Sequence, residues 1–236
     1  MTDQNDQYVE TATPAAGKDS TWSAGGQVVA ALALGAVIAA GLWGLRMVGG
    51  SPSANGKPAT CAPPKATDSP EYPALCAALN RPDLPALLGT PSEHVSEAQS
   101  GGGPITFADG TKQDDASAEI QAGPINMRLT DNQELPFTDY TTVLGPKSKS
   151  TSVLGHPAVT YSDHTTAIGF SLNGGHATTS PGGIARHLVV AKDTKNGGGS
   201  FELTIWRQDD QTPDDAALFR TAVLVLPALQ GWGTGS

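Results

Sequence analysis

Three side-chain types of a serine hydrolase occur close together in the sequence: the carboxylate of Asp163, the imidazole of His164 and the hydroxyl of Ser171. Such chemistry needs a base that takes the serine proton and an acid that orients the base. Ser171 lies in the segment Gly169–Gly174 (GFSLNG), where the second glycine comes one residue too late for a nucleophile elbow. The alternating apolar residues of this segment predict a strand instead.

The neighbours Asp163 and His164 do not predict a working acid–base pair. Adjacent residues of an extended chain point to opposite sides, so this carboxylate cannot easily orient this ring. The pair is more typical of a surface turn. We therefore assign no catalytic residue, and we keep as the alternative function a hydrolase whose active site, built from groups such as Asp163, His164 and Ser171, matches no known motif.

The sequence has no pattern typical of a metal or cofactor site. Its five histidines form no His-x-x-x-His or His-Glu-x-x-His pair. The aspartate doublets lack the alternating ligands and central glycine of a calcium loop, and the glycine runs lack the context of a phosphate-binding loop. The 14 basic and 23 acidic residues give a net charge of −9, which disfavours nucleic acid as a partner. No cofactor and no metal are expected.

An apolar segment near the N-terminus has the length of a membrane-spanning helix. The residues from Thr21 to Leu45 are all uncharged, and about 20 residues cross the hydrocarbon layer of a bilayer. We predict a single transmembrane helix at residues 25–48, with the lipid bilayer as its partner. The preceding tail, residues 1–24, is acidic, whereas a cleaved signal peptide begins with a basic region. We expect this tail to be disordered.

Two lines of evidence disagree about which side of the membrane the domain occupies. Arg46 and Lys57 follow the apolar segment and, by the positive-inside rule, favour a cytoplasmic domain. Cys61 and Cys76 favour the opposite side, because a disulfide between them would stabilise the fold by about 3 kcal/mol and such bonds persist outside the cytosol. A buried, unpaired Cys76 is the alternative. We predict a cytoplasmic N-terminus and a C-terminal domain outside the cell.

The remaining sequence divides into a linker and one domain. Residues 49–70 are rich in Gly, Pro, Ser and Ala and predict a linker. Residues 71–236, with 10 basic and 18 acidic residues, are long enough for one globular core. Small residues recur every fourth position in the apolar segment (Ala31, Gly35, Ala39), a spacing that allows a weak helix-mediated homodimer.

The domain alternates between helical and strand patterns. Helices are predicted at Tyr72–Leu79, at Asp83–Gly89 with Asp83 as N-cap and Gly89 as C-cap, and at Pro213–Leu226, ended by Pro227. Strands are predicted at Val95–Gln99, Ala116–Gln121, Ile125–Thr130, Ala158–Tyr161, Ala167–Leu172, His187–Lys192 and Phe201–Arg207. This order predicts an α+β fold, in which one antiparallel sheet packs against the short N-terminal helices and the C-terminal helix.

The segment Tyr72–Pro91, with its core LCAALNRPDLPALLGTP, carries a resemblance. It resembles the opening of an uncharacterised actinobacterial family of single-pass, membrane-anchored proteins, a domain of unknown function. More loosely, it is similar to actinobacterial lipoproteins with a PsbP-like fold, although this chain has no lipobox. The resemblance implies a PsbP-like sandwich and carries no reaction or functional residue.

We therefore expect an extracytoplasmic domain that acts as a non-catalytic binding or envelope-accessory module. Its partner would be a protein or a small ligand outside the cell. A transmembrane signal receptor is a weaker alternative, because residues 1–24 have neither a helical period nor a basic motif.

Overall fold

The computed structural model describes residues 57–63, 72–101, 104–106, 112–114, 116–133, 137–170, 177–195 and 198–233. The predicted tail and the predicted transmembrane helix, residues 1–24 and 25–48, lie outside this part of the chain. Within it, no helix is long and apolar enough to cross a membrane.

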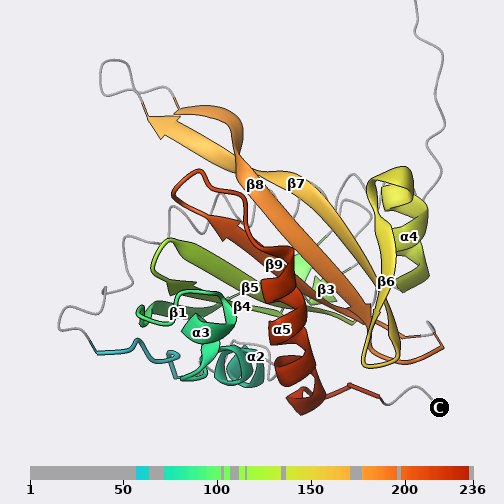
Figure 1. The fold of residues 1–236 in the computed structure, drawn as a ribbon. Helices are drawn as coiled ribbons and strands as arrows, with labels where there is room; N and C mark the ends of the chain where they lie inside the picture. The colour runs from blue at the N-terminus through green and yellow to red at the C-terminus, as the bar shows by residue number, and fades with distance from the viewer. Residues whose placement is uncertain are drawn as a thin grey trace, which may run out of the picture.

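The domain has the predicted α+β fold (Figure 1). Its helices are α2 (Tyr72–Leu79), α3 (Leu84–Leu87), α4 (Phe137–Leu144) and α5 (Asp215–Val225), with the 3-10 helices η1 (Gly145–Lys147) and η2 (Leu226–Ala228). Its strands are β1 (Val95–Gly101), β2 (Pro104–Thr106), β3 (Lys112–Asp114), β4 (Ala116–Ala122), β5 (Ile125–Asn132), β6 (Lys149–Val153), β7 (His156–Phe170), β8 (Ala177–Ala191) and β9 (Ser200–Arg207).

Seven strands form one antiparallel sheet in the order β1-β4-β5-β9-β8-β7-β6. Strands β6 to β9 follow one another as hairpins, and β9 returns to pair with β5, which joins the two halves of the chain. Strands β2 and β3 form a separate hairpin. A turn at Gly123-Pro124 connects β4 and β5, with Gly123 at a φ of +56° that suits glycine.

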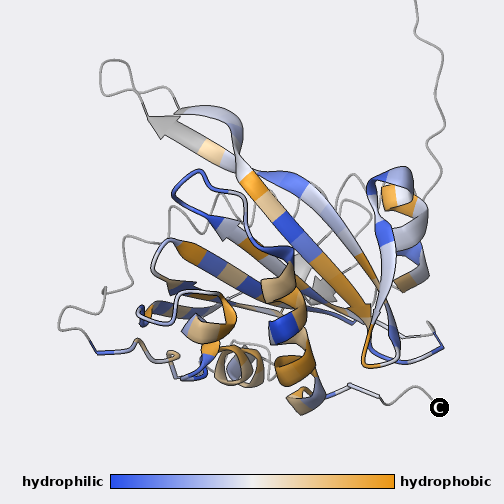
Figure 2. Ribbon diagram, in the orientation of Figure 1, coloured by the Kyte–Doolittle hydropathy of each residue, from blue (hydrophilic) through white to orange (hydrophobic). Residues whose placement is uncertain are grey.

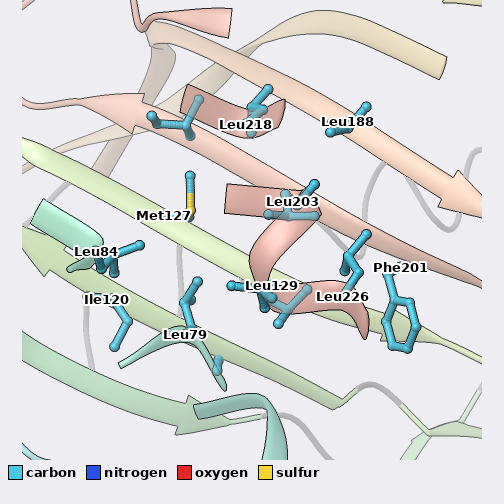
Figure 3. Packing of buried hydrophobic residues seen from close by; sticks show 14 of the residues in the cluster. Leu79, Leu84, Ile120, Met127, Leu129, Leu188, Phe201, Leu203, Leu218 and Leu226 are labelled. Atoms are coloured by element: carbon cyan, nitrogen blue, oxygen red, sulfur yellow. The ribbon is translucent and has the colours of Figure 1, made fainter. Parts of the chain in front are cut away.

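One face of the sheet packs against α2, α3 and α5. Alternate strand residues such as Ile120, Leu129 and Leu203 are fully buried, and they share one hydrophobic cluster with residues of the three helices. Figure 3 shows Leu79 of α2 and Leu84 of α3 beside Ile120 of β4. Figure 2 shows hydrophobic and hydrophilic residues alternating along β5, as the two-residue period of a strand requires.

The opposite face is also covered in part, which the sequence did not predict. Val159, Val189 and Ala191 alternate with residues of the main cluster and form a second cluster with Phe137 of α4. The pattern of α4 was missed because four of its eight residues are polar and only Phe137 is buried. The sheet therefore has helices on both faces.

The first two predicted helices, α2 and α3, are confirmed, and the ends of α3 are corrected. Helix α2 has the predicted bounds. Helix α3 begins after Asp83, whose side chain does not cap it and instead accepts hydrogen bonds from Arg81 at 2.5 and 2.9 Å. Gly89 adopts the left-handed φ of +84° just beyond the helix.

The C-terminal helix is shorter than predicted. Asp214 is its N-cap and accepts a hydrogen bond from the N–H of Ala216 at 2.9 Å, so Pro213 precedes the helix and does not belong to its first turn. Pro227 does not end the helical conformation, because it lies inside the 3-10 helix η2, which follows α5 directly. A proline fits there since the first turn of a helix needs no N–H from it.

Strands β7 and β8 are longer than predicted. The predicted strands Ala158–Tyr161 and Ala167–Leu172 belong to one strand, β7, and Leu172 lies outside the described residues. The five polar residues 162–166 between them hid the continuity because they carry no hydrophobic alternation. Strand β6 was missed for the same reason, since four of its five side chains are exposed.

A disulfide fastens the segment 57–63 to the domain. Cys61 is bonded to Cys76 in α2, and Cys76 is fully buried. The N–H of Ala59 donates to the carbonyl of Val95 at 2.8 Å, and the Asn80 amide donates to the carbonyl of Ala59 at 3.0 Å. This part of the predicted linker therefore lies against α2 and β1.

Candidate functional site

Asp163 and His164, two of the residues that the sequence offered for hydrolysis, do not form an acid–base pair. Asp163 and His164 lie in β7, so the predicted surface turn is wrong, and both are exposed. The carboxylate of Asp163 accepts a hydrogen bond from the N–H of His164 at 2.7 Å, and Nδ1 of that ring lies 3.0 Å from the carbonyl of Gly182. Ser171 lies outside the described residues. The carboxylate thus contacts the backbone and does not orient the imidazole.

A set of polar side chains lies on the face of the sheet opposite α2 and α5. Strand register aligns five of them in a row that crosses β4, β5, β9, β8 and β7: Glu119, Arg128, Thr204, His187 and Tyr161. We call this set the polar row. Neighbouring side chains on one face are close enough to interact across strands.

The Glu202 carboxylate links two members of the polar row. Its Oε1 accepts a hydrogen bond from the Tyr161 hydroxyl at 2.7 Å and lies 2.8 Å from Nδ1 of His187. The rings of Tyr161 and His187 are stacked, with centroids 4.2 Å apart and planes 9° apart. Oγ1 of Thr204 lies 3.1 Å from the same Nδ1. These contacts fix the ring orientation of His187.

Burial and nearby groups together set the pKa values of Glu202 and Tyr161. Burial alone would raise the pKa of Glu202, but the hydrogen bond from His187, its charge and the Tyr161 hydroxyl outweigh that effect and hold the pKa below its ordinary value. Burial, and then the charge of Glu202, raises the pKa of Tyr161 well above its ordinary value. At neutral pH the carboxylate is therefore ionised and the phenol is a hydrogen-bond donor.

Glu119 and Arg128 form the second charged part of the polar row. Nη2 and Nε of Arg128 donate to Oε2 of Glu119 at 2.8 and 3.2 Å, and both side chains are largely buried. Burial raises the pKa of Glu119, and the attraction of Arg128 only partly opposes this rise. The guanidinium also lies over the ring of Trp206, 5.7 Å from its centroid.

Several buried polar atoms on the same face have no hydrogen-bond partner. These atoms, all in the described part of the chain, are Nε2 of His187, Nδ2 and Oδ1 of Asn126, Nδ2 of Asn132 and Oγ of Ser200. Buried polar groups usually have partners, so such a group points to a water, a ligand or a chemical role. An imidazole with Nδ1 on a carboxylate and Nε2 without a partner can accept a proton or a hydrogen bond.

No metal site is evident in the described ranges, which contain no group of three His, Cys, Asp or Glu side chains that could hold an ion. A small hollow of about 60 Å³, partly open to solvent, lies beside the start of α5. Its lining residues are Lys147, Lys149, Thr160, Tyr161, Ser162, Arg186 and Asp215. The guanidinium of Arg186 is already engaged by Asp215, with Nε and Oδ1 3.4 Å apart.

The sequence contained a signal for the polar row, although it did not identify these residues. The polar residues Glu202, Thr204 and Trp206 alternate with buried Phe201, Leu203 and Ile205 as predicted for β9. The same alternation occurs in β4 and β5. The polar sides of these strands share one face, but strand order and register are needed to place them together.

Comparisons with known proteins give a family and no function. A search of the curated proteins and of the solved structures finds no match. The sequence model of the "Family of unknown function (DUF6215)" matches residues 19–147, more than half of the 236 residues. The match covers the apolar N-terminal segment, the disulfide and the first part of the sheet, and it confirms the expected kinship with an uncharacterised family. The chain belongs to DUF6215, a family of unknown function.

Proposed function

We propose that the chain is a single-pass membrane protein whose domain lies outside the cytoplasm and acts as a non-catalytic binding or envelope-accessory module. Residues 25–48 span the bilayer, the N-terminus is inside, and the domain is a PsbP-like sandwich of actinobacterial type. The apolar, uncharged stretch from Thr21 to Leu45 supports the anchor. The sheet with α2, α3 and α5 on one face is compatible with such a sandwich.

The disulfide between Cys61 and Cys76 is the observation that carries this proposal. It joins the segment that follows the apolar stretch to a buried position in α2. Reducing systems keep cytosolic thiols unpaired, so a structural disulfide favours an oxidising compartment. The bond also holds the domain close to the place where the chain would leave the membrane.

The polar row supports a binding role. Within the row Glu119 is paired with Arg128, and His187 contacts Glu202, which fixes the positions of these side chains on rigid strands. The unpartnered amide of Asn126 and Nε2 of His187 add hydrogen-bonding capacity beside these pairs. A partner protein or small ligand with polar groups fits this chemistry better than an apolar one.

A cell-surface hydrolase is the second candidate, and one contact favours it. Nδ1 of His187 lies 2.8 Å from the carboxylate of Glu202, and Nε2, although buried, has no hydrogen-bond partner that would compete with a general-base role. In the described residues no hydroxyl or thiol is hydrogen-bonded to Nε2. Turnover of ester or amide substrates that is lost in His187→Asn, with the fold intact by circular dichroism, would favour the enzyme over the binding module.

Protease accessibility and cross-linking test the first proposal. A full chain with a C-terminal epitope tag is treated with protease in intact cells, beside a cytoplasmic control protein. Loss of the tag with the control intact is the expected result, and a protected tag contradicts the external domain. Chemical cross-linking in the same cells should give a product whose amount saturates as expression rises. A chain that forms no saturable product contradicts the binding role.

A further inference from the structure

Strands β7 and β8 continue beyond the sheet as a two-stranded ribbon (Figure 1). The pairing of β7 with β6 ends at Thr160, and the pairing of β8 with β9 ends at Ala185. We call the described residues beyond these points, 162–170 and 177–184, the β7–β8 arm. In the described part of the chain no third strand pairs with it. An isolated two-stranded ribbon is only marginally stable in water.

Among the described residues, no strand pairs with the outer edge of β7 beyond Thr160. Val153 and His156 flank a two-residue hairpin loop, and in such a hairpin the flanking residues form a hydrogen-bonded pair. The N–H and C=O of His156 therefore point toward β6. Since pairing alternates along an antiparallel ladder, even-numbered residues of β7 direct their N–H and C=O groups away from β8. The N–H of His164 is taken by the carboxylate of Asp163. Beyond that point, Thr166, Ile168 and Phe170 present their backbone groups at the edge.

The outer edge of β8 is less suited to pairing. Pro181 lies opposite Thr166, and the register shifts between His164 and Thr166. By the same alternation the nitrogen of Pro181 faces outward, where it has no proton to donate. Natural sheets use a proline or a bulge to block edge pairing, and β8 has both beside its edge. The β7 edge from Thr166 to Phe170 contains no proline.

Beyond Asp163, the β7–β8 arm also lacks charge. From His164 to Ala185 the sequence contains no Asp, Glu, Lys or Arg, although the whole chain has a net charge of −9. Charged residues on an edge strand oppose association, and this edge has none. Two copies of an acidic chain repel each other over most of their surfaces. The arm is the element on which they can approach without that repulsion.

We propose that the edge of β7 from Thr166 to Phe170 pairs antiparallel with the same edge of a second copy of this chain. A twofold axis relates two identical antiparallel strands, so the pairing closes as a dimer and does not extend into a filament. The dimer joins the two sheets through their arms. It depends on neither the membrane anchor nor the binding role, and it differs from a dimer mediated by the small residues of the apolar segment.

The test measures the dissociation constant of the full chain in detergent micelles by analytical ultracentrifugation. Ile168→Pro removes an outward N–H from β7, and Thr179→Pro removes one from β8 at the directly opposite position. We expect the dissociation constant to rise at least about tenfold in I168P, because each dimer loses two hydrogen bonds. In T179P we expect it to change by less than about twofold.

Three outcomes overturn the proposal: a wild-type chain that stays monomeric, a dimer that survives in I168P, or equal losses in the two variants. Circular dichroism reports whether each variant is folded. If I168P does not fold, Thr166→Asp is tested in its place, since this variant puts a negative charge on the paired edge of each copy. We expect T166D to weaken the dimer and added salt to restore it in part. A dimer unaffected by T166D contradicts the proposal.

Discussion

The hydroxyl of Tyr161 donates to the carboxylate of Glu202 at 2.7 Å, although the two residues are 41 positions apart in the sequence. The same oxygen of Glu202 lies 2.8 Å from the ring of His187. A carboxylate in the middle of a covered sheet would be unstable without such partners. The Tyr161–Glu202 contact therefore connects β7 to β9 across β8 and holds the polar row in place.

The stability of the domain should depend on the charge of Glu202. Its pKa in the folded chain lies below the ordinary value of 4.5, so its contribution is complete above that pH and is lost as the pH falls through the lower folded value. We expect the free energy of unfolding of the wild type to fall below about pH 4.5 more steeply than that of Glu202→Gln. Urea unfolding from pH 7 to 3 measures both slopes, and identical slopes contradict the prediction.

The pair of Arg128 and Glu119 should behave as a coupled unit. Arg128→Met leaves a buried carboxylate without its main counter-charge and should lower the free energy of unfolding by about 3 kcal/mol. Adding Glu119→Gln to that variant removes the uncompensated charge and should restore at least about 1 kcal/mol. Urea unfolding of the single and double variants measures the coupling. Effects that simply add contradict it.

Removal of the disulfide should destabilise the folded domain. The bond closes a loop with a sequence separation of 15, and such a loop contributes about 3 kcal/mol in the chain-entropy account. We expect Cys61→Ala combined with Cys76→Ala to lower the free energy of unfolding by about this amount. Reducing the wild-type protein under native conditions is the matched control and should have a similar effect. A loss below about 1 kcal/mol in both experiments contradicts the prediction.

Two adjacent glycines at the base of the β7–β8 arm should differ in their tolerance of a methyl group. A Cβ on Gly182 would lie 2.4 Å from Oγ1 of Thr165 and 3.0 Å from its carbonyl oxygen, whereas one on Gly183 would lie 3.5 Å from the carbonyl of Arg207. Gly182→Ala should therefore cost about 1–3 kcal/mol and Gly183→Ala should have little effect. Thermal unfolding compares them, and equal shifts contradict the expectation.

The sequence predicted those elements whose hydrophobic period is strong. Helix α2 and strands β1, β4, β5 and β9 begin at or within one residue of the predicted starts, because apolar residues recur there at helical or strand spacing. The β7–β8 arm was missed as a continuous ribbon since its Thr, Ser and Gly residues have no such period. Helix α4 was missed because tertiary contacts of Phe137, and not its own pattern, fix its place.

The candidate site was less predictable than the fold. Asp163 and His164 attracted attention because they are neighbours in the sequence, yet the structure separates the carboxylate from the ring. His187 and Glu202 are 15 positions apart, and only the pairing of β8 with β9 brings them together. Spacing along one chain does not encode such contacts across strands.

Thiol labelling of intact cells tests the external position of the domain most directly. Cells that express the full chain are treated with a membrane-impermeant maleimide before and after exposure to an impermeant reductant. The account predicts no labelling of either cysteine without reductant and labelling of Cys61, the more exposed of the two, after its addition, since the bond lies outside the membrane. A Cys61 that stays unlabelled under both conditions, and reacts as a free thiol only after lysis, would contradict the external domain.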